Sequence, residues 1–101
     1  MANVKTLIAA VAATDATKRV FTLSAKNFKD GSTPALRSTG CGVGDDIILW
    51  VYVAGGWVSL GSVLDDVTET YAISTMGEYA VTTTMGTVGP VSCELHCNDA
   101  A

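Results

Sequence analysis

The sequence contains little charge, and its few positive charges are confined to its first 37 residues. Only 16% of its 101 residues are Asp, Glu, Lys or Arg, and the formal net charge at pH 7 is −4. Binding to nucleic acid requires clustered Lys and Arg that neutralise phosphates, so this composition argues against a nucleic-acid partner. No apolar run approaches the about 20 residues that a membrane-spanning helix requires. Hydrophobic residues nevertheless make up 49% of the chain, which is enough for a single folded domain over residues 1–101.

Groups that carry out catalysis or hold cofactors are equally sparse. His96 is the only histidine, and no serine lies in the context of a nucleophile elbow. The segment "GCGVG" at residues 40–44 lacks the Lys-Ser/Thr that follows a phosphate-binding glycine loop. The acidic pairs at 45–46 and 65–66 lie at strand and turn boundaries, where Asp is favoured for bonding to the local backbone. The sequence therefore predicts a protein without catalytic residues, metal ions or cofactors.

The three cysteines do not form a recognisable metal site or disulfide pair. Cys93 and Cys97 share one face of an expected strand, where four residues at about 3.3 Å each separate them by about 13 Å. A disulfide needs Cα atoms within about 7 Å, so these two cannot bond while the chain is extended. His96 points to the opposite face from both, which argues against zinc. We interpret Cys93 and Cys97 as small buried hydrophobic residues. With Cys41 they make an odd set, so at least one thiol is unpaired within the chain.

The N-terminal segment "MANVKTLIAAVAATDA" superficially resembles a secretory signal. Its apolar part is short for that purpose, and only one lysine precedes it. We interpret residues 4–11 instead as the opening strand of the domain, and we expect a protein made in the cytoplasm, a reducing compartment, without a secretion signal.

Alternating apolar and polar residues predict an all-β fold. Val and Thr are abundant, and Gly recurs at intervals that suit turns. About seven strands with turn signals every about eight to twelve residues are typical of an antiparallel β-sandwich or jelly-roll-like barrel. Residues 26–44 are expected to form a long surface loop, with a short extended piece at residues 35–37. The expected strands cover residues 4–11, 19–25, 47–54, 57–60, 67–73, 78–84 and 91–97.

Two local patterns predict specific structural features. Gly77-Glu78-Tyr79 resembles the start of a strand in many sandwiches, where a tyrosine hydroxyl ties a loop to the sheet as a tyrosine corner. Gly55-Gly56 lies between two runs of strand formers, which indicates a two-residue hairpin turn that pairs residue 54 with residue 57. This hairpin is expected near the centre of the sandwich.

Neither face of the expected hairpin is polar. One face collects a set suited to a core: Leu49, Val51, Val53, Val58 and Leu60. The other face collects a largely aromatic set: Ile48, Trp50, Tyr52, Ala54 and Trp57. A hairpin of this kind is either covered on both sides or contributes to an interface.

The order of these pieces resembles that of small β-sandwich virion proteins of tailed bacteriophages. The resemblance rests on the alanine-rich start "LIAAVAATDATKRVFTLS", the hairpin "GDDIILWVYVAGGWVSL", the strand ending "TYAIS" and the final "GEYAV…GPVSCEL" pair. It implies a non-enzymatic capsid decoration or cement protein that binds the phage head through the major capsid protein or other virion subunits. The alternative is a carbohydrate- or receptor-binding module of a fibre or tail, in which the aromatic face would stack on sugar rings.

The distribution of charge suggests how copies or partners could meet. All six basic residues lie in the first 37 positions, whereas eight of the ten acids follow them. One interpretation is that strands from both halves interleave, so that the asymmetry averages out on the surface. The other is that a basic patch meets an acidic patch on a neighbouring subunit of a homo-oligomer, with a trimer as the expected state. The expected interface residues are Lys18, Arg19, Trp50, Tyr52, Trp57, Asp65, Asp66 and Glu69.

Overall fold

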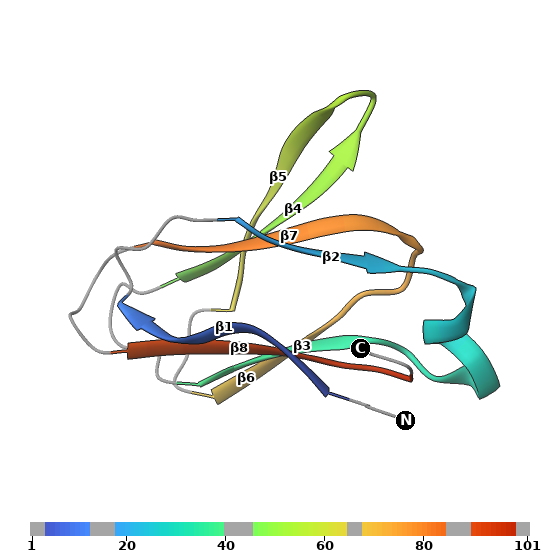
Figure 1. Cartoon of the computed structure of the whole chain (residues 1–101), viewed down its shortest axis with the longest axis horizontal. Coiled ribbons are helices and arrows are strands. Elements are labelled where there is room, and N and C mark those ends of the chain that lie inside the picture. Colours follow the sequence, from blue (N-terminus) through green and yellow to red (C-terminus); the bar gives the residue numbers. More distant parts are fainter. Residues whose placement is uncertain (1–3, 13–17, 40–45, 65–67, 85–89, 99–101) are drawn as a thin grey trace.

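The computed structural model describes residues 4–12, 18–39, 46–64, 68–84 and 90–98. These residues form two four-stranded antiparallel sheets that face one another, so the expected all-β sandwich is confirmed (Figure 1). The described residues contain eight strands rather than about seven. The strands are β1 (Val4–Ala12), β2 (Arg19–Leu23), β3 (Ala35–Thr39), β4 (Asp46–Val53), β5 (Gly56–Leu64), β6 (Thr68–Ala72), β7 (Gly77–Thr84) and β8 (Pro90–His96).

The strand pairing is that of a jelly roll. β1 pairs with β8, β2 with β7, β3 with β6 and β4 with β5. These nested pairs are those of one long hairpin whose turn lies between β4 and β5. Rolling this hairpin up adds the pairs β3–β8 and β4–β7, which gives the sheet orders β1-β8-β3-β6 and β2-β7-β4-β5. Two sheets built in this way from eight strands define the jelly-roll architecture. The β4–β5 hairpin is therefore the midpoint of the roll, and β5 is an edge strand.

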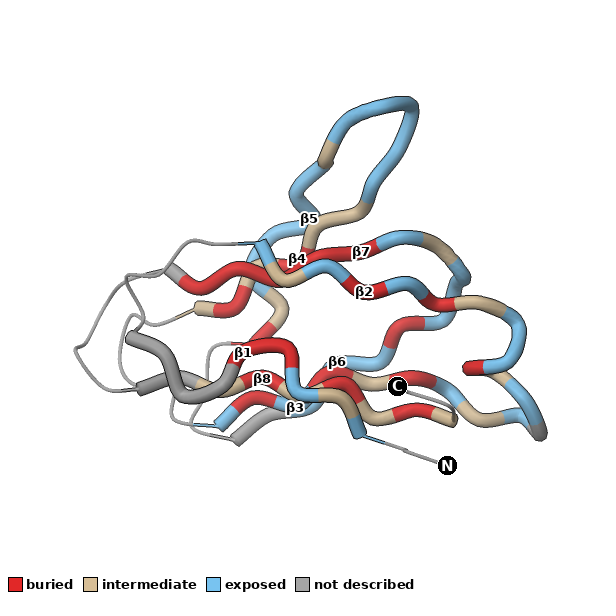
Figure 2. Tube along the Cα trace, viewed as in Figure 1, coloured by how far each residue is buried: buried red, intermediate tan, exposed pale blue. Residues whose placement is uncertain are grey.

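The core lies between the sheets and follows from strand alternation. In β3 and β8 every second side chain is buried, which places Leu36, Cys93 and Leu95 between the layers (Figure 2). Burying one large aliphatic side chain contributes about 1.5–3 kcal/mol, so this layer is the main source of stability. The core cluster consists of Leu7, Ile8, Phe21, Leu23, Leu36, Ile47, Leu49, Leu64, Ile73, Tyr79, Val81, Cys93, Leu95 and Cys97.

The segment expected to be a long surface loop contains two regular elements. A 3-10 helix, η1 (Ala25–Gly31), is followed by β3. Asn27 closes the first turn by accepting the backbone N–H of Ser24 on Oδ1 at 2.8 Å. Its Nδ2 donates to the carbonyl oxygen of Asn98 at 2.8 Å, and the residue is buried. Since this amide joins η1 to the end of the chain's last strand, the segment is anchored to the sandwich instead of lying loosely on it.

The expected tyrosine corner is confirmed. Tyr79 lies near the start of β7 and is buried, and its hydroxyl donates to the carbonyl oxygen of Thr75 at 2.9 Å. The Thr75 hydroxyl lies 2.7 Å from the same oxygen. The ring stacks on Phe21 of the neighbouring strand, with centroids 5.7 Å apart. The side chain therefore ties the segment between β6 and β7 to the sheet.

The expected register of the β4–β5 hairpin is wrong by one position in the turn. The turn residues are Ala54 and Gly55, with φ of 51° and 84°, and Val53 pairs with Gly56. Positive φ at both central residues is the geometry of a type I′ turn, which matches the twist of the flanking strands. Moving a two-residue turn by one position shifts the partners by two, so the side chains outside the turn keep their faces. Ala54, which was expected on the aromatic face, is instead a turn residue. Tyr52 now lies directly opposite Trp57.

The expected central position of the hairpin is also wrong. Only β4 has neighbours on both sides, because β5 closes the edge of its sheet. Leu49 is buried as expected, but Val53, Val58 and Leu60 are about half exposed, at 52%, 50% and 50%. The expected core face of the hairpin therefore leaves the core after Val51.

Candidate functional site

The end of the β4–β5 hairpin projects beyond the sandwich as an arm, which we define as residues 52–60. The pairing of β4 with β7 ends at Val51 and Tyr79, whereas the pairing of β4 with β5 continues to Val53 and Gly56. Beyond Val51, no other strand among the described residues lies beside the hairpin. Figure 1 shows β4 and β5 rising away from both sheets.

Irregular pairing in β5 accounts for the change of direction at the base of the arm. The register shifts twice, between the pairs of Ile47 and Ile48 and again between those of Ile48 and Trp50. Gly61 lies within this segment with φ of 90°, a conformation that glycine adopts at little cost. Each register shift leaves an extra residue in β5, and such β-bulges bend a strand and increase its twist. The bulged base therefore directs the arm away from the sheet.

Side-chain hydrogen bonds hold the bulged base in shape. Gly61 donates its backbone N–H to the hydroxyl of Ser59 at 3.1 Å. Ser62 donates its hydroxyl to a carboxylate oxygen of Asp46 at 2.9 Å, which links the base of β5 to the start of β4. These contacts replace ladder hydrogen bonds that the irregular register disrupts.

The arm carries apolar side chains on both faces and no charge. No charged residue occurs from Ile47 to Leu64. Val53, Val58 and Leu60 lie on one face, and Tyr52, which is 44% exposed, lies on the other. Figure 2 shows that most of the tip of the hairpin is exposed, with Trp57 intermediate. Exposed apolar surface that is contiguous is typical of interaction sites, so the arm is the candidate site.

The aromatic residues expected at an interface fall into two separate groups. Tyr52 and Trp57 pack edge to face, with centroids 5.2 Å apart and planes at 71°. Trp50 instead lies at the base of the arm, where its indole N–H donates to the hydroxyl of Thr82 at 2.9 Å. The ammonium group of Lys18 lies 4.5 Å from the centre of the Trp50 ring, within the range of a cation–π contact. Lys18 and Trp50 were both expected at the interface, and the structure brings them together.

The remaining expected interface residues do not join this group. Arg19 begins β2 and is half-buried opposite Val81. Glu69 lies on β6, in the other sheet, opposite Ser38, and its side chain is outside the described part of the structure. Asp65 and Asp66 also lie outside the described residues. The contact between a basic and an acidic patch therefore remains a prediction.

The basic residues are distributed over several elements of the fold. Lys5 lies on β1, Arg19 on β2 and Arg37 on β3, while Lys26 and Lys29 lie on η1. This placement follows from the rolled hairpin, which interleaves strands from the two halves of the sequence. It corresponds to the interpretation in which the charge asymmetry is spread over the surface.

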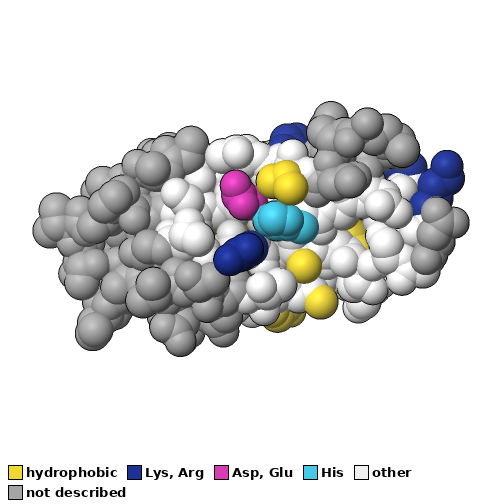
Figure 3. Space-filling model, turned by 90° about the horizontal axis from the view of Figure 1, so that it is seen from below, with side chains coloured by type: hydrophobic (Ala, Val, Ile, Leu, Met, Phe, Trp, Pro, Cys, Tyr) yellow, Lys and Arg dark blue, Asp and Glu magenta, His cyan; other side chains and the backbone are white. Residues whose placement is uncertain are grey.

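The outer face of the β1-β8-β3-β6 sheet carries the only histidine. His96 Nε2 lies 3.2 Å from Oε1 of Glu94, and Arg37 lies opposite Glu94 on the neighbouring strand. Figure 3 shows an acidic, a histidine and a basic side chain side by side on this face. Cys93 and Cys97 are buried on the opposite side of β8, as the alternation predicts. Among the described residues no group of three or more His, Cys, Asp and Glu side chains could hold a metal ion.

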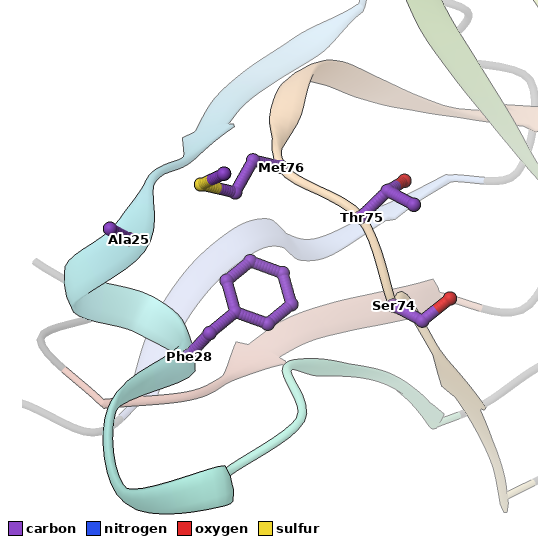
Figure 4. A pocket seen from close by; sticks show the side chains of 5 residues that line it. All are labelled: Ala25, Phe28, Ser74, Thr75 and Met76. Carbon is purple, nitrogen blue, oxygen red and sulfur yellow. The ribbon is translucent and has the colours of Figure 1, made fainter.

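A small open pocket lies between η1 and the segment before β7. It encloses about 520 Å³ and is lined by Ala25, Phe28, Ser74, Thr75 and Met76. Figure 4 shows Phe28 extending into the pocket from η1 and Met76 extending into it from the segment before β7. The lining contains two hydroxyl groups and no ionisable side chain, so it offers apolar contact but no acid, base or nucleophilic pair.

In comparisons with known proteins, no family model, no curated protein and no solved structure matches this chain. Within the residues that the structure describes, no helix has the length and apolar character needed to span a membrane.

The arm is the most distinctive surface in the described structure, because its apolar side chains are about half exposed. Sequence reasoning identified its apolar faces but assigned one of them to the core. The signal for exposure was Gly61, which interrupts the strand pattern where the arm bends.

Proposed function

We propose that this protein is a non-enzymatic structural protein that attaches to a protein partner through the arm. The observation that supports this proposal best is the position of the exposed apolar side chains. Val53 lies beyond the last pairing of β4 with β7, Val58 lies opposite Val51 at that last pair, and Leu60 lies at the bulged base of the hairpin. All three are about half exposed. A preorganised apolar projection loses little conformational freedom on docking, and burial of its side chains in a partner's groove favours binding.

The composition of the arm favours a protein partner over a sugar. Sugar sites combine aromatic rings with polar groups that bind hydroxyls. Around Tyr52 and Trp57 the arm offers valine, leucine, alanine, glycine and one serine, Ser59, whose hydroxyl already accepts the Gly61 N–H. The two rings are nearly perpendicular. The Lys18 ammonium group lies over the Trp50 ring, so one face of that ring is already in contact with another side chain. These features support protein contact more than flat stacking on a sugar ring.

We further propose that the partner is the major capsid protein of a tailed bacteriophage, and that this protein decorates and stabilises the head. The jelly-roll architecture supports this proposal as an analogy, since it recurs in viral capsid proteins, although it also recurs in lectins. The sequence resemblance to small phage virion proteins supports the same partner.

The test is binding of purified protein to heads of the phage that encodes it. We expect the double variant Val53→Ser/Leu60→Ser to bind at least about tenfold more weakly, since losing about 1.4 kcal/mol of apolar burial corresponds to that factor. The matched control Val4→Ser/Val20→Ser changes valines of similar exposure outside the arm, and it should bind like the wild type. Bound copies per head are counted by quantitative mass spectrometry of sedimented particles. Equal binding by both variants, or a positive glycan array with no binding to heads, would overturn the proposal.

A further inference from the structure

The free edge of β5 differs from the other edges of the two sheets. β1, β2 and β6 each carry a charged residue, namely Lys5, Arg19 and Glu69. β5 reads "GWVSLGSVL" and has neither charge nor proline. Charges and prolines on edge strands normally prevent two sheets from joining edge to edge. β5 is thus the one edge strand of the described structure that lacks this protection.

The register identifies which backbone groups on β5 are available. Val53 and Gly56 close the two-residue turn and form a hydrogen-bonded pair of the ladder. Hydrogen-bonded and non-bonded pairs alternate along antiparallel strands, so Trp57 and Ser59 direct their N–H and C=O groups away from β4. The regular edge ends near Leu60, because the Gly61 N–H is taken by the Ser59 hydroxyl and the bulge begins there.

We propose that two copies of this chain pair through β5, antiparallel and about a two-fold axis at Val58. In this register Trp57 of one copy lies opposite Ser59 of the other, and both exchange backbone hydrogen bonds. The two Val58 side chains meet on one face, each beside a Leu60. Two-fold symmetry brings like residues together, so an uncharged edge can pair with itself where a charged edge would oppose like charges.

The size of the contact indicates a reversible dimer. A regular edge of five residues (56–60) buries less than the about 800 Å² per partner of a standard stable interface. We therefore expect dimerisation to depend on protein concentration in the micromolar range. The pairing uses the edge of the arm and leaves its two faces accessible, so it does not rest on the proposed attachment to a capsid.

Cysteine cross-linking tests the register. Residues of a non-hydrogen-bonded antiparallel pair have Cα atoms about 4.5 Å apart, which is within the range of a disulfide. We expect Val58→Cys to form a covalent dimer under mild oxidation. The matched control is Val20→Cys on the edge strand β2, since Val20 is 46% exposed and Val58 is 50% exposed. The wild type controls for the native cysteines. Cross-linking of Val58→Cys no greater than in these controls would overturn the register.

Light scattering over a concentration series tests the edge itself. Val58→Lys opposes two positive charges at the axis, and Ser59→Pro removes an outward N–H without interrupting the β4–β5 ladder. We expect both variants to weaken dimerisation at least tenfold, while Val20→Lys matches the wild type. Ser59→Ala loses only the hydroxyl that binds the Gly61 N–H, so it controls for that contact and should dimerise like the wild type. Circular dichroism confirms that each variant is folded. If the wild-type protein is monomeric or trimeric at every concentration, the proposed β5 dimer is wrong. If that monomer still binds phage heads, only the dimer is wrong and the proposed attachment is unaffected.

Discussion

At the scale of single residues, the hydroxyl of Tyr79 makes the clearest individual contribution. It donates to the carbonyl oxygen of Thr75 from a buried position, while the ring is held by Phe21. Tyr79→Phe keeps the ring and removes the hydrogen bond. We expect it to lower the free energy of unfolding by about 1 kcal/mol, the usual contribution of one such bond. The measurement is the midpoint of chemical denaturation at unchanged slope, and an unchanged midpoint would contradict the structural role of the hydroxyl.

At the scale of elements, the turn of the arm holds an alanine in a backbone conformation that favours glycine. Ala54 has φ of 51°, and a side chain in this left-handed region costs about 1–2 kcal/mol relative to the right-handed one. We expect Ala54→Gly to raise the free energy of unfolding by about 0.5–1 kcal/mol, since glycine adopts positive φ without strain. Thermal melting measures the effect.

The matched comparison is Gly55→Ala at the next position, where φ is 84°. No atom lies within 4 Å of the added Cβ, so any loss comes from the backbone and not from a clash. We expect this variant to be destabilised by about 1 kcal/mol. If both substitutions change stability in the same direction, the type I′ assignment of the turn is wrong.

At the scale of the whole molecule, salt dependence separates two modes of assembly. Pairing through β5 involves an uncharged segment, whereas a contact between basic and acidic patches weakens as salt screens the charges. We expect the dimer dissociation constant to stay within about twofold between 0.05 M and 0.5 M NaCl, or to fall slightly as salt strengthens apolar burial. Sedimentation velocity provides the constants. A tenfold weakening at high salt would favour the charged contact between Lys18 or Arg19 and the segment around Asp65.

The sequence by itself determined the features that depend on neighbouring residues. Alternation places Leu36, Cys93 and Leu95 on inward faces because successive side chains of a strand point to opposite sides. The same local reasoning identified the tyrosine corner at Tyr79. It also placed the side chains of the β4–β5 hairpin on their correct faces, except for Ala54, which lies in the misplaced turn. Fold class followed from the number and spacing of these strands.

Only the tertiary structure decided which of the apolar side chains are covered. Val53 and Leu49 lie on one face of β4, yet Leu49 is buried and Val53 is half exposed, because β7 accompanies β4 only as far as Val51. The bulge at Gly61 then directs the remainder of the hairpin away from the sandwich. Whether a residue is buried depends on strands distant in sequence, and a local pattern carries no information on where those strands end. For that reason the sequence predicts the hairpin, and the packing around it makes the hairpin an arm.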